Sequence, residues 1–304
     1  MIKNILIVKG GKSAEAEVSR KTAANVEVAL KQLGYNVMQV EAQDNLITFL
    51  NNNNKEIDVI FNALHGVWGE DGKIQGLFEY FNIPYTHSGV SASAIGMNKF
   101  LSKSIFFNND INVPKGKIIN VEELITKEPF KRPFILKPVS EGSSLGIKLI
   151  KEGTEIVNLE ISNKLQNYLV EEYIPGNDFT VAVMDGKAIG IMEVVTENEI
   201  YDYDYKYKKN KNIRYVFPKD LEENIELQLI KFSEKAFKLL NCNGIARVDF
   251  RINIKSQNKK VYLLEINTQP GLTENSLFPK IAKNAGMTFP DLINWVVKGA
   301  GLNK

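Results

Sequence analysis

The stretch YLLEINTQPG, residues 262–271, contains the clearest structural pattern in the chain. Its apolar first half is typical of a buried strand, and alternation along a strand places Glu265 and Asn267 on the same face. The preceding stretch GIARVDF, residues 244–250, predicts a second strand that carries the carboxylate of Asp249. If the two strands are adjacent and antiparallel, these three oxygen-bearing side chains lie together on one face of a sheet.

A magnesium–nucleotide site is the interpretation that we favour for these two strands. Carboxylate and carboxamide oxygens are the ligands that hard cations prefer, and Arg247 shares the face of Asp249 because it lies two residues before it. The alternative is that Asp249 and Glu265 are separate surface charges on unrelated strands. We favour it less because apolar runs bound both residues, and a buried carboxylate needs a partner.

Length and composition describe an ordinary globular protein. The chain has 304 residues, of which 44% are apolar and 24% charged, so two or three domains are expected. A net charge of +2 gives no basic field for nucleic acid. The single cysteine, Cys242, excludes an intramolecular disulfide and is typical of a reducing compartment. Because no apolar run approaches the ~20 residues of a membrane span, we expect a cytoplasmic enzyme with no membrane partner.

The order of apolar and polar segments predicts a mixed α/β (α+β) fold of three domains. Residues 1–92 alternate strand and helix, which is typical of a parallel sheet with helices on its faces. Residues 93–174 are expected to hold one helix followed by strands, and residues 175–304 to begin with a hairpin at Asp185-Gly186 and to contain the two strands of the metal site. The asparagine run 51–54 is interpreted as a turn between a helix and a strand.

A glycine turn follows the first predicted strand. GGKS, residues 10–13, is not a P-loop, because Leu6 stands where that motif requires its first glycine. No G-x-G-x-x-G follows any strand, so a dinucleotide fold is not supported. Glu15 lies at the start of the next helix, where it either complements the helix dipole or faces a ligand ammonium at the edge of the sheet.

Two further loops have more glycine and polar residues than a turn requires. HGVWGEDG, residues 65–72, follows the third predicted strand, although a plain surface loop remains an alternative. EGSSLG, residues 141–146, offers backbone N–H groups for phosphate oxygens, although glycine–serine hairpins are common. Lys137 lies just upstream and Lys99 earlier, and each ammonium suits phosphate as a point charge.

Two other segments admit both a functional and a structural explanation. EEYI, residues 171–174, ends a predicted strand, where Glu171 either accepts from an adenine amine or is simply exposed. YDYDYKYKK, residues 201–209, alternates aromatic, acidic and basic residues. Its aspartates argue against a single-stranded nucleic-acid surface, and a loop that closes over a ligand, with Lys206 and Tyr207 directed inward, fits better.

Taken in order, these segments resemble the ATP-grasp fold and, more narrowly, the D-alanine–D-alanine ligase family. The resemblance covers nearly the whole chain and implies an N-terminal parallel α/β domain followed by a two-part ATP-grasp fold. It rests on nine segments in register: GGKSAEAEVS (10–19), ALHGVWGEDG (63–72), IPYTHSGV (83–90), MNK (97–99), LKPVSEGSSLG (136–146), VEEYIPGNDFTVAV (170–183), YDYDYKY (201–207), GIARVDF (244–250) and LLEINTQPGLTENSL (263–277).

The resemblance implies how ATP and metal ions are held. Two Mg²⁺ (or Mn²⁺) ions would be bound by three residues, Asp249, Glu265 and Asn267. The nucleotide would be bound through phosphate, adenine and ribose by Lys99, Lys137, Ser143, Ser144, Glu171, Tyr173, Ile174, Asp178 and Lys206. At Asp178 the family commonly has glutamate, so the ribose contact is one methylene shorter here.

The resemblance also implies the residues that hold the amino-acid substrates. Glu15, with His65 nearby, would bind the ammonium of the first D-alanine, and Ser276 with the amide of Leu277 the carboxylate of the second. Arg247 and the amide of Gly271 would stabilise the oxyanion. Tyr207 would link to Ser143 and Glu15 on loop closure, which gives the catalytic set Glu15, Ser143, Tyr207, Arg247 and Gly271.

The expected reaction is ATP-dependent ligation of two D-alanines through an acylphosphate, for cell-wall peptidoglycan synthesis. The family usually forms homodimers, so a homodimer is expected. A D-alanine–D-lactate ligase is the nearest rival, and Tyr207 rather than phenylalanine favours the amine acceptor. An alternative from a different class of protein is a nucleotide-binding module without catalytic activity. Such a module would not need both the metal carboxylates and Arg247.

Overall fold

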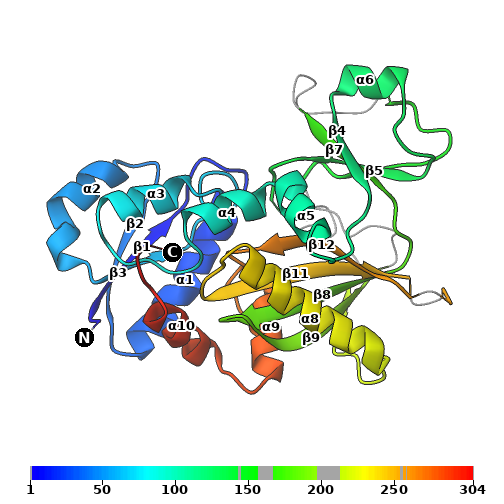
Figure 1. Ribbon diagram of the computed structural model, residues 1–304. Helices are drawn as coiled ribbons and strands as arrows, with labels where there is room; N and C mark the ends of the chain where they lie inside the picture. Colours follow the sequence, from blue (N-terminus) through cyan, green and yellow to red (C-terminus); the bar gives the residue numbers. More distant parts are fainter. Residues whose placement is uncertain are drawn as a thin grey trace.

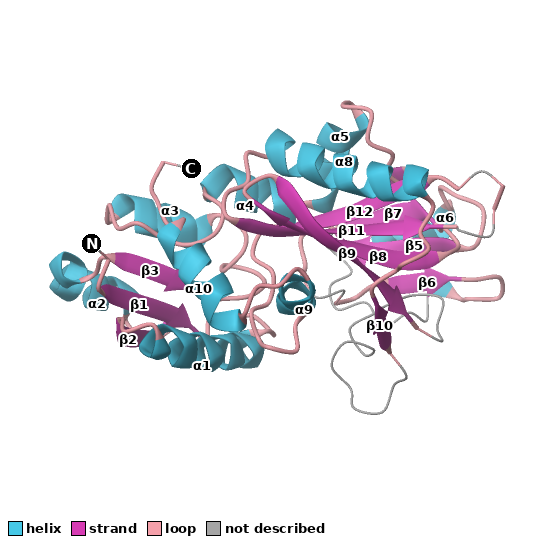
Figure 2. Ribbon diagram, turned by 90° about the horizontal axis from the view of Figure 1, so that it is seen from below, coloured by secondary structure: helices cyan, strands magenta, loops and turns pink. Residues whose placement is uncertain are grey.

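The part of the chain that the structure describes forms three sheets with helices around them (Figure 1; Figure 2). The structure is a computed structural model that describes residues 2–142, 145–156, 167–196, 213–253, 256–257 and 259–303. One sheet falls within each of the three predicted domains, and the mixed α/β class is confirmed. The exact boundaries, 1–92, 93–174 and 175–304, stay a prediction. Among the helices of the described residues, none has the length and apolar character required to cross a membrane.

The N-terminal sheet is parallel, as the βαβαβ pattern predicts. Its strand order is β2-β1-β3, with Ile5 of β1 aligned to Val37 on one side and Val59 on the other. This part of the chain consists of β1 (Asn4–Lys9), α1 (Ala16–Gln32), β2 (Asn36–Glu41), α2 (Leu46–Asn53), η1 (Asn54–Glu56), β3 (Val59–Asn62), α3 (Lys73–Tyr80) and α4 (Val90–Met97).

Helix α1 ends two residues before Gly34. Its buried face carries Val26 and Leu30, four residues apart, which pack against the sheet. The helix stops at Gln32, and Gly34 follows with φ +83°, a left-handed conformation that glycine adopts without steric cost. The N–H of Gly34 donates to the carbonyl of Lys31 at 3.1 Å.

The asparagine run 51–54 is not the predicted turn. Residues 51–53 form the last turn of α2, and residue 54 begins η1. Leu46 and Leu50 of α2 are buried in the core, and the side chain of Asn53 donates to the carbonyl of Phe49 at 2.8 Å. Packing of the apolar face therefore outweighs the poor intrinsic helix propensity of asparagine.

The middle sheet is antiparallel, with strand order β4-β7-β5-β6. Asparagine side chains cap both helices of this part: Asn98 accepts from the N–H of Leu101 at 3.0 Å, and Asn120 from the N–H of Glu123 at 2.7 Å. The elements are α5 (Lys99–Phe107), β4 (Gly116–Ile119), α6 (Val121–Thr126), β5 (Phe134–Pro138), β6 (Lys148–Ile150) and β7 (Tyr168–Glu172).

The third sheet is also antiparallel, with strand order β10-β9-β8-β11-β12. The predicted hairpin joins its strands β8 and β9 through Asp185-Gly186. Helices α5 and α8 lie on the same side of this sheet (Figure 2). The elements are β8 (Asn177–Met184), β9 (Lys187–Val195), β10 (Arg214–Val216), α8 (Glu223–Leu239), β11 (Ile245–Ile252) and β12 (Val261–Asn267).

The last two helices return to the N-terminal sheet. Helix α10 (Phe289–Lys298) packs beside α1, and α9 (Leu277–Asn284) links it to the third sheet (Figure 1). Beyond α10, the backbone of Gly301 exchanges two hydrogen bonds of 3.2 Å with Tyr85. Both ends of the chain therefore contribute to one core, which includes Ile5, Ile7, Val26, Phe278, Ile281 and Val296.

Two glycine-to-alanine substitutions are expected to have opposite effects on the free energy of unfolding. Gly76 lies inside α3 with open space at its Cβ position, so Gly76→Ala is expected to add about 0.5–1 kcal/mol. Gly34 also has open space but a positive φ, so Gly34→Ala is expected to cost about 1–2 kcal/mol. Urea unfolding measures both, and a stabilising Gly34→Ala would contradict the assignment of the α1 stop.

Candidate active site

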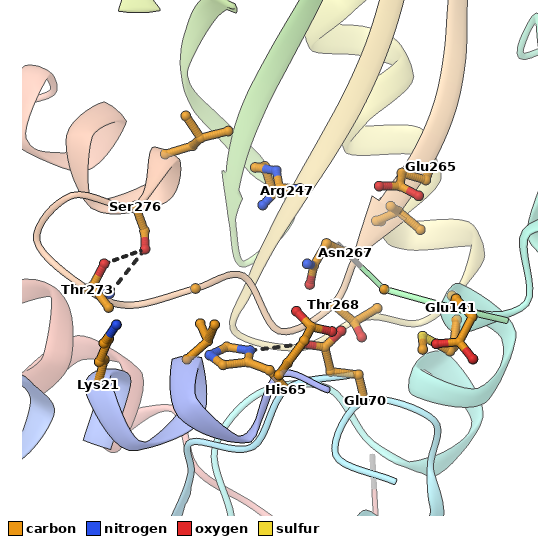
Figure 3. Close-up of a pocket in the computed structure, with 18 of the residues that line it drawn as sticks. Lys21, His65, Glu70, Glu141, Arg247, Glu265, Asn267, Thr268, Thr273 and Ser276 are labelled. Carbon is orange, nitrogen blue, oxygen red and sulfur yellow. Dashed lines mark hydrogen bonds and ion pairs between the residues drawn. The ribbon is translucent and has the colours of Figure 1, made fainter. Parts of the chain in front are cut away.

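Two adjoining cavities are lined by all the described residues for which the resemblance implies a role in binding or catalysis. The larger, of about 320 Å³, is lined by Glu15, His65, Lys99, Asn267, Gly271 and Ser276 among others (Figure 3). The smaller, of about 120 Å³, is lined by Lys137, Glu171, Tyr173, Ile174, Asp178 and Asp249 among others. Three residues line both: Arg247, Glu265 and Leu277. Their individual roles stay predictions. Four predicted residues, Ser143, Ser144, Lys206 and Tyr207, and the expected lid at 201–212 lie outside the described residues.

Strands β11 and β12 meet as the sequence predicts. They are antiparallel neighbours, with Asp249 opposite Glu265 and Arg247 opposite Asn267. Arg247 donates to both oxygens of Asp249, at 2.9 and 2.8 Å. The hydroxyl of Thr180, on β8, donates to the same carboxylate at 2.7 Å. Asp249 is therefore held from two strands, at the junction of the cavities.

The carboxylate pair fits a hard cation. The Nζ atom of Lys99 lies 3.3 Å from Glu265, and Asn267 accepts from the N–H of Gln269 at 2.8 Å. Within the described ranges, no three His, Cys, Asp or Glu side chains are close enough to form a metal site by themselves. Two carboxylates and a carboxamide nevertheless suit Mg²⁺, which usually takes one or two protein carboxylates and completes its shell with phosphate oxygens and water.

A buried cluster of two lysines and one glutamate lies beside the smaller cavity. Glu171 is 2% exposed; one of its oxygens contacts the ammonium of Lys103, and the other lies 2.5 Å from that of Lys137. This position excludes the alternative that Glu171 is an exposed strand end. Sequence analysis missed Lys103, although it follows Lys99 by four residues and therefore shares its helix face.

The three charges shift one another's pKa values. Burial lowers the pKa of Lys103 to about 7, although the Glu171 carboxylate acts in the opposite direction. For Lys137, burial again lowers the pKa, but Glu171 outweighs it and the net direction is upward. Burial alone would raise the pKa of Glu171, and the two ammonium groups hold it below its usual range. Glu171 is therefore a carboxylate at neutral pH.

At the far end of the larger cavity, glycines leave room for Glu15. Its carboxylate is buried at the start of α1. A Cβ atom at Gly142 would lie 2.7 Å from Oε2 of Glu15, and one at Gly66 would lie 2.6 Å from it. Two loops far apart in sequence thus approach this carboxylate closely because each has a glycine at the point of contact.

His65 belongs to an ordered network rather than to a plain surface loop. Its Nδ1 lies 3.0 Å from Oε1 of Glu70 (Figure 3). Its Nε2 lies 3.0 Å from the hydroxyl of Thr22 on α1. His65 and Glu70 are both buried. The ring is therefore fixed from both sides at the wall of the cavity.

Gln269 joins the N-terminal sheet to the loop after β12, and sequence analysis assigned it no role. Its amide donates to the carbonyl of Leu64 and accepts from the side chain of Asn62 at 2.8 Å. Both side chains are buried. The only sequence signal is a polar residue at or just after the end of each of two strands, which does not identify the partner.

The loop before α9 is folded around Ser276. Its hydroxyl lies 2.8 Å from that of Thr273 and accepts from the N–H of Thr273 at 3.2 Å (Figure 3). A Cβ atom at Gly271 would lie 3.1 Å from the same oxygen. Ser276 occupies the N-cap position of α9, and Leu277 is the first helical residue.

Arg251 fixes the far wall of the smaller cavity and was also missed. Its Nη1 donates to both oxygens of Asp178, at 2.9 and 3.0 Å, and its Nε to the carbonyl of Ile174 at 2.7 Å. Its Nη2 donates to the hydroxyl of Tyr173 at 3.3 Å. The carboxylate of Asp178, which is expected to contact the ribose, is therefore hydrogen-bonded to Arg251.

Two antiparallel sheets, a cavity lined by Lys137 and by the carboxylates of Asp249 and Glu265, and a parallel α/β domain define an ATP-grasp enzyme. Comparison with known proteins agrees. The family described as "D-ala D-ala ligase C-terminus" matches residues 110–298, and "D-ala D-ala ligase N-terminus" matches residues 39–88. The chain belongs to the D-alanine–D-alanine ligase family.

Individual relatives match over nearly their whole length. The D-alanine–D-alanine ligase of Pelagibacter ubique is 41% identical over 311 residues, covering 100% of both chains, and that of Rickettsia typhi is 39% identical, covering 98% of this chain and 92% of its own. Among solved structures, the Bacillus anthracis ligase complexed with ATP gives a TM-score of 0.81 at 29% identity, covering 98% of this chain and 97% of its own. The Coxiella burnetii ligase gives 0.79 at 26% identity, covering 98% and 93%.

Gly142→Ala is expected to displace the Glu15 carboxylate. The new methyl would meet Oε2 at 2.7 Å, and Gly142 has no positive φ that would add backbone strain. Because a hydrogen bond to a charged group is weakened, the KM of the amino-acid substrate held by Glu15 should rise about ten-fold or more. Steady-state kinetics measure this, with Gly76→Ala as the control, and an unchanged KM would remove Glu15 from substrate binding.

Proposed function

We propose that the protein uses ATP to join two D-alanines into D-alanyl-D-alanine, through an acylphosphate, as a step in peptidoglycan precursor synthesis. The chain is an ATP-dependent ligase by family. The observation that carries the proposal is the pairing of β11 with β12, which puts Glu265 and Arg247 where the two cavities join and Asp249 beside them in the smaller cavity. A nucleotide in the smaller cavity then has its reactive end directed toward the substrates in the larger one.

The reaction needs activation because a carboxylate does not react with an amine. ATP first phosphorylates the carboxylate of one D-alanine, and Lys99 and Lys137 offset the phosphate charge. Mg²⁺, when bound by the carboxylate pair, neutralises phosphate oxygens and orients them. We propose two Mg²⁺ ions at Asp249, Glu265 and Asn267, since each carboxylate lies at the cavity junction.

The remaining residues place the two amino acids. Glu15 binds the ammonium of the first D-alanine, and Ser276 with the amide of Leu277 binds the carboxylate of the second. The amine of the second D-alanine attacks the acylphosphate, and Arg247 with the amide of Gly271 stabilises the tetrahedral oxyanion until phosphate leaves. His65 lies beside Glu15 in the wall of the same cavity, where Ser13 and Thr22 contact it.

Nucleotide recognition falls to the smaller cavity. Glu171 accepts from the adenine amine, and the backbone of Tyr173 and Ile174 contacts the ring. Asp178 contacts the ribose while Arg251 holds it. Ser143, Ser144, Lys206 and Tyr207 complete the site as the resemblance implies. We further propose a cytoplasmic homodimer, as is usual for this family, and the domain division at residues 92 and 174.

The activity is tested by phosphate release from Mg-ATP. Release is expected to require D-alanine, to be absent with L-alanine, and to yield the dipeptide of two D-alanines. Replacing the second D-alanine by D-lactate tests the alternative that the protein is a D-alanine–D-lactate ligase. If the protein binds ATP but D-alanine does not stimulate phosphate release, it either acts on another substrate or is catalytically silent.

Arg247→Met is expected to lower kcat by about 10²–10³-fold, because one oxyanion donor is lost. The matched control is Arg20→Met, which removes an arginine–glutamate pair outside both cavities, with Glu41 at 3.1 Å. Steady-state kinetics separate the two possible roles of Arg247. A raised KM for ATP with unchanged kcat would show that Arg247 serves only to orient Asp249.

A further inference from the structure

The buried cluster beside the nucleotide cavity contains one more cation than it has carboxylates. Both oxygens of Glu171 have their own ammonium partner, Lys103 on one side and Lys137 on the other. All three residues are at most 6% exposed. A buried carboxylate requires a partner, but one well-placed ammonium is enough to satisfy that requirement. The second lysine therefore needs another explanation.

The two lysines differ in what they can reach. Lys137 lies on β5 and lines the nucleotide cavity, so its ammonium is within reach of a bound ligand. Lys103 lies on α5 and lines neither of the two cavities. Lys103 therefore contacts Glu171 from outside the cavity, whereas Lys137 contacts it from the cavity wall.

Helix α5 holds Lys103 in this position. The N–H of Lys99, at the start of the helix, donates to the carbonyl of Val139 at 3.0 Å, which ties α5 to the end of β5. The Lys99 ammonium also donates to the carbonyl of Glu141 at 2.6 Å. Lys103 follows Lys99 by one helical turn. The same helix therefore supplies Lys99 to the larger cavity and Lys103 to the buried cluster beside the smaller one.

We propose that Lys103 is a positioning residue: it remains the counter-ion of Glu171 when Lys137 leaves that carboxylate to bind the phosphates of the nucleotide. This inference rests on the proposed function, in which ATP is the substrate and Lys137 binds phosphate. Without Lys103, the movement of Lys137 would leave a buried carboxylate uncompensated. Glu171 would then retain Lys137 and compete with the phosphates for it.

The electrostatics of the cluster agree with this exchange. The ammonium of Lys137 is one of the groups that lower the pKa of Lys103, and the carboxylate of Glu171 raises it. When Lys137 moves toward the phosphates, its repulsion of Lys103 decreases. The ion pair between Lys103 and Glu171 therefore becomes stronger as the other pair is broken.

The first test is Lys103→Met, which keeps most of the side-chain volume and removes the charge. The KM for ATP is expected to rise about ten-fold or more, with the KM for D-alanine unchanged, and Lys103→Arg is expected to restore most of the loss. Lys117→Met is the matched control. Lys117 lies on β4, in the same sheet as Glu171, and its replacement removes an exposed ion pair with Glu123 of α6. An unchanged KM for ATP, or an equal rise in both KM values, would overturn the proposal.

The second test asks whether Lys103 acts through Glu171. Glu171→Gln removes the need for a counter-ion, so adding Lys103→Met to it should raise the KM for ATP little further. An equal increment in both backgrounds would show that Lys103 acts on the nucleotide directly, against the proposal. If Lys103→Met alone does not fold, the comparison of Glu171→Gln with the double variant still tests the proposal, because a large rise in the KM for ATP between these two variants would contradict it.

Failure of the proposed function is recognised separately. If wild-type protein binds Mg-ATP but forms no dipeptide, the proposed function is wrong, and the same variants are compared by calorimetric Kd for Mg-ATP. Weaker binding by Lys103→Met, restored by Lys103→Arg, would still support the role of Lys103. Equal binding by all variants would overturn it.

Discussion

The antiparallel alignment of β11 between β8 and β12 is the constraint on which the rest of the site depends. It places Thr180 and Glu265 on either side of Asp249, although all three come from separate strands. A slip of one residue would turn Arg247 and Asp249 to the opposite face of the sheet. That face is packed against α8 through apolar residues such as Val248, so the core fixes the register and the register fixes the site.

Charge compensation is the second principle of the site. Asp249 is paired with Arg247, Asp178 with Arg251, and Glu171 with two lysines. These pairs hold the polar groups in place before a ligand arrives, so less reorganisation is needed on binding. At Glu171, the movement of Lys137 that we propose would make ligand binding an exchange of ion-pair partners.

Sequence patterns were sufficient for the strands and for the residues that line the cavities. Alternation placed Glu265 and Asn267 on one face, and the motifs located the loops, because both depend on near neighbours in the chain. The residues that were missed, Lys103, Arg251 and Gln269, have partners on elements distant in sequence. The prediction of a turn at the asparagine run was wrong for a related reason: burial of Leu46 and Leu50 determines the conformation of this segment, and local propensity does not.

The return of the chain to its first sheet has a consequence for biosynthesis. The core that includes Ile5 and Val26 is completed by Phe278 and Val296, and the backbone of Tyr85 pairs with Gly301. On a ribosome, which adds about 5–20 residues per second, the N-terminal part waits for nearly the entire remaining chain before its core closes. The middle sheet, by contrast, is built from residues 116–172 and has its partners at once. The segment translated first is thus among the last to reach its native packing.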